Sequence, residues 1–336
     1  MRRTGFLIWH RRLALAFAPL LLLQAMTGAV LLLREPLSGL LGPYGGAGAY
    51  QPVSAIVAAA GVAAAGHDGA RVDRLFLPAR AGDVAMAQRS DGTYAAVDPA
   101  SALVVREGGA FAFPLEAALQ WHYRLMWGTT GLAIVALSGI VLSLLAASGI
   151  GFWWPAKGRW GKALTINPRM PGRVRLRQWH RSGGVVIAVL VLLSAVTGVL
   201  LSGPDVFVGA APVQAGYRPT GAQIDAAVAA AKAQFPGAPL RDIRFPKADR
   251  LDINFRADDD GPRSVHVVAV TLSTAKVIKV TPAAHNDALW MKVLPLHTGE
   301  SFGAIGLVLL LAEAVVLAAL AVTGPRMWWQ QRKLRK

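Results

Sequence analysis

Four stretches of the chain are apolar with almost no charge, and longer segments of mixed character separate them. They cover residues 13–33, 130–150, 183–202 and 302–323. A run of about 20 apolar residues gives an α-helix long enough to cross the ~30 Å hydrocarbon core of a bilayer. The pattern therefore predicts a membrane α-helical protein with four transmembrane helices.

The two long segments between these stretches each have the pattern of a small α+β module. Apolar residues at helical spacing begin at Val53 in the first segment and at Ile224 in the second, and four short runs of alternating residues follow each. The runs are residues 71–77, 83–89, 93–97 and 102–105 in the first segment, and 240–245, 251–255, 264–270 and 275–280 in the second. Asp91-Gly92 is a hairpin signal between two runs. Each segment thus predicts one helix against a small antiparallel sheet.

Two motifs occur twice with their spacing preserved. Thr27-Gly28 follows Trp9-His10-Arg11 at the distance at which Thr197-Gly198 follows Trp179-His180-Arg181. His122 precedes Gly131, Gly149 and Trp153-Trp154 at the spacings at which His297 precedes Gly306, Gly324 and Trp328-Trp329. We interpret the chain as two tandem parallel repeats, so that four histidines lie at the ends of four spans.

The repeats divide the chain into eight parts. The transmembrane helices are residues 1–33, 121–154, 179–203 and 297–329, the polar modules are 34–120 and 204–296, and a basic loop at 155–178 and a tail at 330–336 complete the chain.

Charge fixes the expected orientation. The net charge of +16 is typical of nucleic-acid-binding proteins, but seventeen of the 35 Lys and Arg residues lie in residues 1–12, 151–181 and 325–336, which contain no acidic residue. Positive charge collects at the cytoplasmic ends of spans. We therefore expect contact with the lipid bilayer and not with nucleic acid. Both termini and the middle loop are expected in the cytoplasm, and both modules in the periplasm.

The chain has no cysteine. This excludes disulfides, thiolate metal sites, iron–sulfur clusters and covalent haem attachment. Any haem would be bound non-covalently. The middle loop also lacks the glycine-rich motifs that bind nucleotides.

The repeated Trp-His-Arg motifs, the Gly-x(3)-Trp-Trp endings at 149–154 and 324–329, the four spans and the two modules together resemble the PepSY-associated transmembrane family of bacterial inner-membrane proteins. The resemblance covers nearly the whole chain. The family includes di-haem reductases that release iron from ferric siderophores at the periplasmic face. The resemblance therefore implies two haem b groups held by histidines, and electron flow towards the periplasm.

The topology restricts which histidines share a haem. His10 and His180 begin the two outgoing spans, whereas His122 and His297 begin the two returning spans. A pseudo-twofold axis along the membrane normal would pair His10 with His180 and His122 with His297. Two imidazoles saturate a haem iron and suit electron transfer. About 20 helical residues, or ~30 Å, would separate the two levels, which is long for direct transfer.

Alternatives remain for several of these residues. A histidine beside Trp at a membrane surface is often an anchor. Arg11 and Arg181 are candidates for binding haem propionates, but equally for contact with lipid headgroups. Thr27 and Thr197 would back-bond within their helices, and Gly28 and Gly198 would allow close packing.

The remaining polar candidates have simpler expected roles. Glu313 is the one carboxylate inside a span, and we expect it to be buried against another helix or a haem edge. His67, His266 and His285 have no repeat partners, and structural or solvated roles are expected for them; His285 is also a candidate for a place near the outer haem.

The favoured function is an inner-membrane electron conduit. An unidentified cytoplasmic or membrane donor would reduce the inner haem, and a ferric siderophore would be reduced at the periplasmic face. The alternative is a membrane-anchored PepSY regulator or inhibitor of periplasmic peptidases without redox activity. A quinol-oxidising cytochrome b is disfavoured, because no span carries the paired histidines that stack two haems between two helices.

Overall fold

The computed structural model describes residues 3–46, 48–62, 70–208, 219–247 and 249–333. The chain divides into two compact units. The first consists of long helices, and the second is built around one β-sheet.

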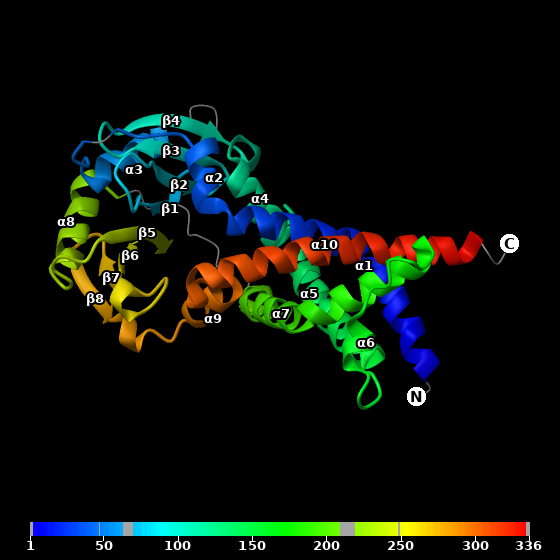
Figure 1. Cartoon of the computed structure of the whole chain (residues 1–336). Coiled ribbons are helices and arrows are strands. Elements are labelled where there is room, and N and C mark those ends of the chain that lie inside the picture. The colour runs from blue at the N-terminus through cyan, green and yellow to red at the C-terminus, as the bar shows by residue number, and fades with distance from the viewer. Residues whose placement is uncertain (1–2, 47, 63–69, 209–218, 248, 334–336) are drawn as a thin grey trace. The chain divides into compact units, whose positions relative to one another are not determined.

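Four long helices form the first unit (Figure 1). They are α1 (Arg3–Leu32), α5 (Gly128–Trp153), α7 (Gly172–Val208) and α10 (Gly303–Lys333). Each is long and apolar enough to cross a membrane, which confirms the four predicted spans. Both α1 and α7 pack on α5 and α10, so the helices form a four-helix bundle. Val186, Val189 and Ile305 point outward with at least 70% of their surface exposed, as expected for side chains that face lipid.

A short helix precedes both α5 and α10. These are α4 (Pro114–Arg124) and α9 (Leu289–His297), and the 3-10 helix η4 (Glu300–Phe302) follows α9. Left-handed backbone conformations separate each short helix from the span that follows. His122 and His297 therefore lie at the ends of short helices, and not in the first turn of a continuous span as the sequence predicts.

Two repeated glycines make these tight turns possible. A Cβ atom at Gly131 would collide with the carbonyl oxygen of Arg124, and a Cβ atom at Gly306 would collide with that of Gly299. The number of residues from each histidine to its glycine is therefore set by the turn between the short helix and the span that follows it.

Several short elements complete the connections. They are α2 (Arg34–Leu41), η1 (Ala110–Ala112), α6 (Trp160–Leu164), η2 (Asp258–Asp260) and η3 (Ala283–His285). The helix α7 begins inside the segment predicted as the basic loop, so the loop is shorter than expected.

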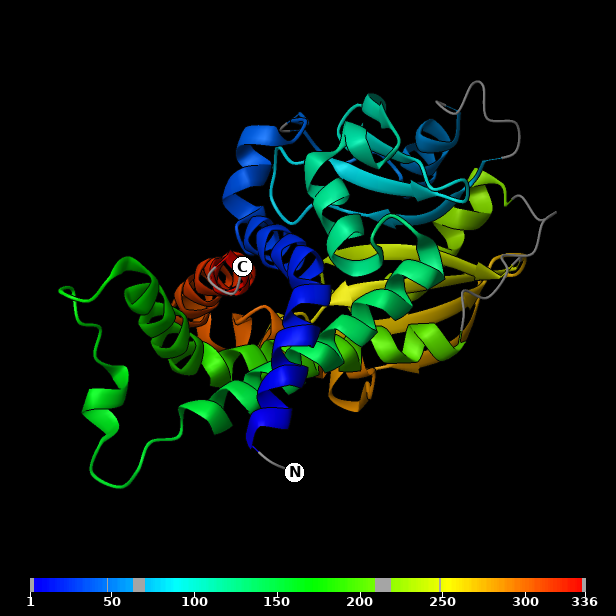
Figure 2. The ribbon, with the colours of Figure 1, turned by 90° about the vertical axis from the view of Figure 1, so that its right-hand side faces the viewer.

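The second unit contains an eight-stranded antiparallel sheet (Figure 2). Its strands are β1 (Val72–Phe76), β2 (Ala85–Arg89), β3 (Tyr94–Asp98), β4 (Leu103–Gly108), β5 (Leu240–Lys247), β6 (Arg250–Arg256), β7 (Val265–Thr271) and β8 (Lys276–Thr281). All eight predicted strands are confirmed, with ends shifted by at most a few residues.

The strands of both predicted modules share this sheet. The order is β4-β3-β2-β1-β5-β6-β7-β8, so β1 and β5 join two four-stranded halves. Leu75 lies opposite Ile243 at this junction, and both side chains are fully buried. The sequence predicts a small sheet for each segment and does not predict the junction.

Two helices cover one face of the sheet (Figure 1). They are α3 (Val53–Val62) and α8 (Gly221–Lys232), and they pack on each other and on the strands. Ile56, Val228 and Phe255 belong to the single apolar core beneath them. Ser54 donates a hydrogen bond of 2.5 Å to Asp225, which ties the two helices together. Because these contacts cross between the predicted modules, the modules fold as one unit.

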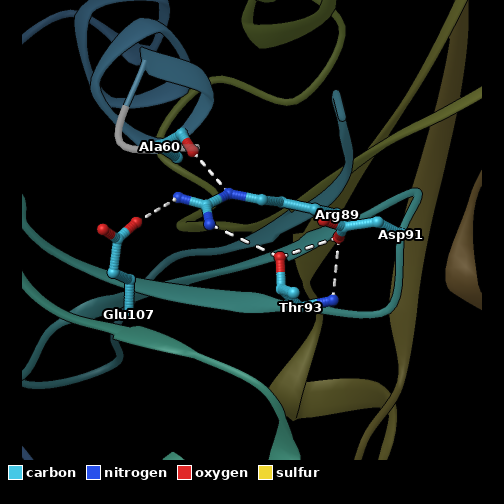
Figure 3. Close-up of polar contacts among 5 residues, drawn as sticks. All are labelled: Ala60, Arg89, Asp91, Thr93 and Glu107. Atoms are coloured by element: carbon cyan, nitrogen blue, oxygen red, sulfur yellow. Dashed lines mark hydrogen bonds and ion pairs between the residues drawn. The ribbon is translucent and has the colours of Figure 1, made fainter. Parts of the chain in front are cut away.

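A buried arginine links elements of the first half-sheet (Figure 3). The Arg89 side chain is 3% exposed. It donates to the carbonyl oxygen of Ala60 at 2.7 Å, to Glu107 at 3.0 Å and to Thr93 at 3.4 Å. Thr93 in turn donates to Asp91, in the predicted hairpin turn. The positive charge is thus paired, as burial requires.

Candidate functional site

Each of the four repeated histidines lies against a hydroxyl residue that is followed by glycine on a neighbouring helix. In every case the histidine Nδ1 atom is within hydrogen-bond distance of the hydroxyl oxygen. The pairs are His10 with Ser148 at 2.7 Å, His122 with Thr27 at 3.1 Å, His180 with Thr323 at 2.9 Å and His297 with Thr197 at 2.9 Å. Helices that face each other in the bundle therefore hold all four rings in the same way.

The glycine after each hydroxyl makes room for the imidazole ring. A Cβ atom at Gly28 would lie 3.1 Å from the Cε1 atom of His122, and one at Gly198 would lie 3.4 Å from that of His297. The corresponding distances are 3.5 Å from Gly324 to His180 and 3.9 Å from Gly149 to His10. We call each hydroxyl–glycine pair, with the imidazole ring that it contacts, a histidine seat. The tightest seats are those of His122 and His297, where a residue larger than glycine would push the ring away.

The hydroxyl groups also favour one tautomer of each imidazole ring. Each hydroxyl donates to a backbone carbonyl of its own helix, so its oxygen is left to accept from the histidine. The acceptors are Leu23 for Thr27 at 2.8 Å, Leu193 for Thr197 at 2.6 Å, Leu145 for Ser148 at 3.1 Å and Leu320 for Thr323 at 3.4 Å. This network suits the tautomer that carries its proton on Nδ1, in which the Nε2 lone pair is available to a metal.

His122 and His297 face each other. Their ring centroids are 6.2 Å apart and their planes make an angle of 52°. Two imidazoles that bind one metal from opposite sides, through bonds of about 2 Å, place their centroids roughly 6 Å apart. Burial, and to a lesser extent the nearby His297, lower the pKa of His122, so its ring is neutral at pH 7. The spacing and the charge state both suit a metal held between the two rings.

His10 lies on α1 and contacts α5, and His180 lies on α7 and contacts α10. The Phe152 ring packs edge-on against His10 with 5.8 Å between centroids. His10 lies near the start of α1, whereas His122 contacts Thr27 near its end. Positions 10 and 27 of a helix are about 25 Å apart along its axis. The four histidines therefore form two groups at opposite ends of the bundle.

The basic residues beside the inner histidines lie at the surface. Arg181 is exposed and Arg11 is half-buried. Arg12 lies over the Trp9 ring at 5.9 Å, and Trp9 and Trp179 are each more than half exposed. These positions suit residues at a membrane surface, and both predicted roles of Arg11 and Arg181 stay predictions.

Glu313 is buried between α7 and α10, as the sequence predicts. Its side chain is 4% exposed and accepts a hydrogen bond of 2.9 Å from Ser194. Ser194 lies one turn before Thr197, which holds His297. The carboxyl group is thus close to one histidine seat without touching the ring.

Two of the three unrepeated histidines lie in the sheet unit. His266 stacks on Phe235 with 4.1 Å between centroids, and its Nδ1 accepts from the backbone N–H of Ala283 at 2.9 Å. This is a structural role, as predicted. His285 belongs to η3, whereas His67 lies outside the described residues.

Sequence reasoning missed Ser148 and Thr323 as histidine partners. The signal was present, because each directly precedes a repeated glycine, as Thr27 and Thr197 do. Within the described residues, no three His, Cys, Asp or Glu side chains cluster as a metal site.

Comparison with known proteins places the chain in a family. The family model described as "PepSY-associated TM region" matches residues 7–331. No curated protein matches significantly.

Proposed function

Because the chain belongs to the PepSY-associated TM family, we propose that it is an inner-membrane oxidoreductase that carries electrons across the bilayer on two haem b groups and reduces ferric siderophores at the periplasmic face. The observation that supports this most directly is the repeated histidine seat. Four rings contact hydroxyl–glycine pairs through Nδ1, and the centroids of two of them are 6.2 Å apart.

The residues present fit haem. A porphyrin supplies four nitrogen ligands, so the protein needs to supply only two axial ligands for each iron. His122 and His297 have the spacing for one iron. His10 and His180 also have hydroxyl partners at Nδ1, from Ser148 and Thr323, and would hold the second haem iron. When bound, haem would supply a one-electron Fe(III)/Fe(II) couple at each histidine pair.

The protein's own groups would position and tune this couple. The hydroxyl groups of Thr27, Thr197, Ser148 and Thr323 hold each imidazole in one tautomer and one orientation. Partners of this kind are an important part of a metal site, because they set ligand basicity. The apolar residues around the ligands would also influence the redox potential, because they limit the access of water. Arg11 and Arg181 are proposed to bind haem propionates at the inner surface.

The siderophore is proposed to bind at the end of the bundle that carries His122 and His297. Hard oxygen ligands hold Fe(III) more strongly than Fe(II), so one electron weakens the chelate and releases iron. The positive charge of residues 1–12, 151–181 and 325–336 supports a cytoplasmic position for the opposite end. The electron donor, from the cytoplasm or the membrane, would act there.

The test is made on purified full-length protein. We expect two b-type haems by pyridine haemochrome assay, and oxidation of the chemically reduced protein by a ferric hydroxamate siderophore, with the Fe(II) trapped by a ferrous chelator. His122→Ala should abolish this oxidation, whereas the matched control His285→Ala should not. Colourless protein that cannot be reconstituted with haem would contradict the proposal and favour a PepSY regulator.

A further inference from the structure

A groove of about 410 Å³ lies between α1 and the last turns of α10. Leu15 from α1 and Pro325, Arg326, Trp328, Trp329 and Gln330 from α10 line it. Its wall is mainly apolar and aromatic, with one guanidinium and one amide at its edge. Pockets that bind small molecules combine these features, an apolar wall and a few polar groups that set orientation.

The corresponding tryptophan pair in the first half of the chain contacts a third aromatic ring. Trp160 of α6 packs against Trp153 and Trp154, with ring centroids 5.2 Å from each. Trp328 and Trp329 occupy the same place in the Gly-x(3)-Trp-Trp motif. In the described part of the chain, no aromatic ring contacts them in this way, although the guanidinium of Arg332 lies over the Trp328 ring at 4.9 Å. Trp329 is 62% exposed, much as Trp154 is at 60%. The first pair thus shows that an aromatic group of indole size packs edge-on against this motif, and the exposed Trp329 offers such a contact to a ligand.

The groove lies beside one of the inner histidines. Pro325 directly follows Gly324, the glycine that makes room for His180. None of the four repeated histidines lines the groove, and its described lining includes no residue of α5 or α7. A haem iron between His10 and His180 would therefore lie outside the groove but near it.

We propose that this groove binds the head group of an isoprenoid quinol, which is the electron donor of the protein and does not require the stacked haems of a quinol-oxidising cytochrome b; this deepens the proposed function and rests on it. The ligand must be planar and aromatic to contact Trp328 and Trp329 as Trp160 contacts Trp153 and Trp154. It must also reach the groove from the bilayer. Arg326 and Gln330 lie one helical turn apart and can donate hydrogen bonds to the two oxygens of a quinone or quinol ring. The isoprenoid tail would extend past Leu15 along the apolar surface of α1.

The reaction balances with the acceptors of the proposed function. The quinol loses two electrons and two protons and becomes a quinone. With haem held at both histidine pairs, the two electrons would be accepted by the two irons, one at each pair. The two protons pass to water at the basic end of the bundle, next to the exposed Arg326.

Binding is tested first, without turnover. Full-length protein in quinone-free phosphatidylcholine nanodiscs is titrated with decylubiquinone and followed by calorimetry. Leu15→Trp fills the groove and Trp329→Ala removes an aromatic wall, so each should weaken binding by about tenfold or more. The matched control is Trp154→Ala, which alters the pair that contacts Trp160 and should leave quinone binding unchanged. Unchanged binding in both groove variants, or no binding by the unaltered protein, would overturn the proposal.

Reduction is tested second, on the haem-loaded protein. Decylubiquinol should reduce the unaltered protein and Trp154→Ala at similar rates, and the groove variants about tenfold more slowly, whereas dithionite should reduce all four equally. Loss of haem absorbance from the groove variants, with quinone binding unchanged, would assign the groove to haem and overturn the proposal.

The two proposals fail in different ways. Protein with two haems that dithionite reduces, but that neither binds decylubiquinone nor oxidises decylubiquinol, overturns the quinol site and leaves the proposed function standing. Protein that holds no haem overturns the proposed function, and with it the role of the quinol as donor, even if decylubiquinone binds in the groove.

Discussion

The imidazole rings of His122 and His297 lie 6.2 Å apart, between short helices that belong to different halves of the sequence. Replacing either residue with Ala should remove or convert one and the same haem, because only one imidazole remains to bind its iron. Either the haem content falls from about two to about one per chain by pyridine haemochrome assay, or that haem loses its low-spin spectrum. The remaining haem should keep its low-spin electron paramagnetic resonance signal.

The pairing has a direct control. His10→Ala and His180→Ala should remove the other haem and leave the first. If His10→Ala and His122→Ala abolished a common signal instead, the proposed pairing would be wrong.

Thr27 should govern how firmly His122 holds its ligand. The Thr27→Val substitution keeps the shape of the side chain but removes the hydroxyl that accepts from Nδ1. Loss of a partner of this kind lowers metal affinity by about 10–100-fold. The measurement is the rate of haem transfer to apomyoglobin, with Thr27→Ser as the matched control that restores the hydroxyl. Equal transfer rates for Val and Thr would show that the hydroxyl is only a packing group.

The sequence predicts the elements better than it predicts these partnerships. The four spans and eight strands follow from local periodicity, and each histidine is marked by its repeated motif. Ser148 and Thr323 receive their roles only when α5 meets α1 and α10 meets α7. The turn that separates His122 from α5 requires three left-handed residues, including Leu125 and Met126. These non-glycine residues carry no recognisable turn signal, so the short helix α4 is not predicted.

Gly131 should not tolerate even one added methyl group. In Gly131→Ala the Cβ atom would collide with the carbonyl oxygen of Arg124, which is backbone and has no rotamer to change. We expect a loss of stability on the order of a few kcal/mol, measured as a lower midpoint of thermal unfolding. Gly151→Ala is the matched control, because a Cβ atom at Gly151 meets nothing within 4 Å. Similar midpoints for the two variants would contradict this explanation of the His-to-Gly spacing.

Glu313 should influence the haem held by His297 without holding it. Gln at this position still offers an oxygen to the Ser194 hydroxyl, so the fold should persist. If the carboxyl group is ionised, its replacement removes a negative charge that favours Fe(III), and the midpoint potential should rise by on the order of tens of millivolts. Spectroelectrochemical titration of Glu313→Gln measures this, with Ser138→Ala as the control at the corresponding position. Identical midpoint potentials in Glu313→Gln and the unaltered protein would show that Glu313 has only a structural role.

The orientation can be tested independently of any cofactor. Fusions after residues 80 and 250 should be active with a periplasm-dependent reporter such as alkaline phosphatase, and fusions after residue 165 should be inactive. The physical reason is the clustering of basic residues beside the middle loop and both ends of the chain. Activity of a cytoplasm-only reporter at 80 or 250 would reverse the topology.

The junction between β1 and β5 constrains how the protein is made. During synthesis, β1 leaves the ribosome long before residues 240–247 that pair with it, and α5 and α7 must be inserted into the membrane in between. Until then, the half-sheet of β1–β4 has an unpaired edge at Leu75, which invites wrong pairing with other chains. A chain that stops after α7 should therefore aggregate or require a chaperone. The two halves, however similar in sequence, cannot mature one after the other as independent domains would.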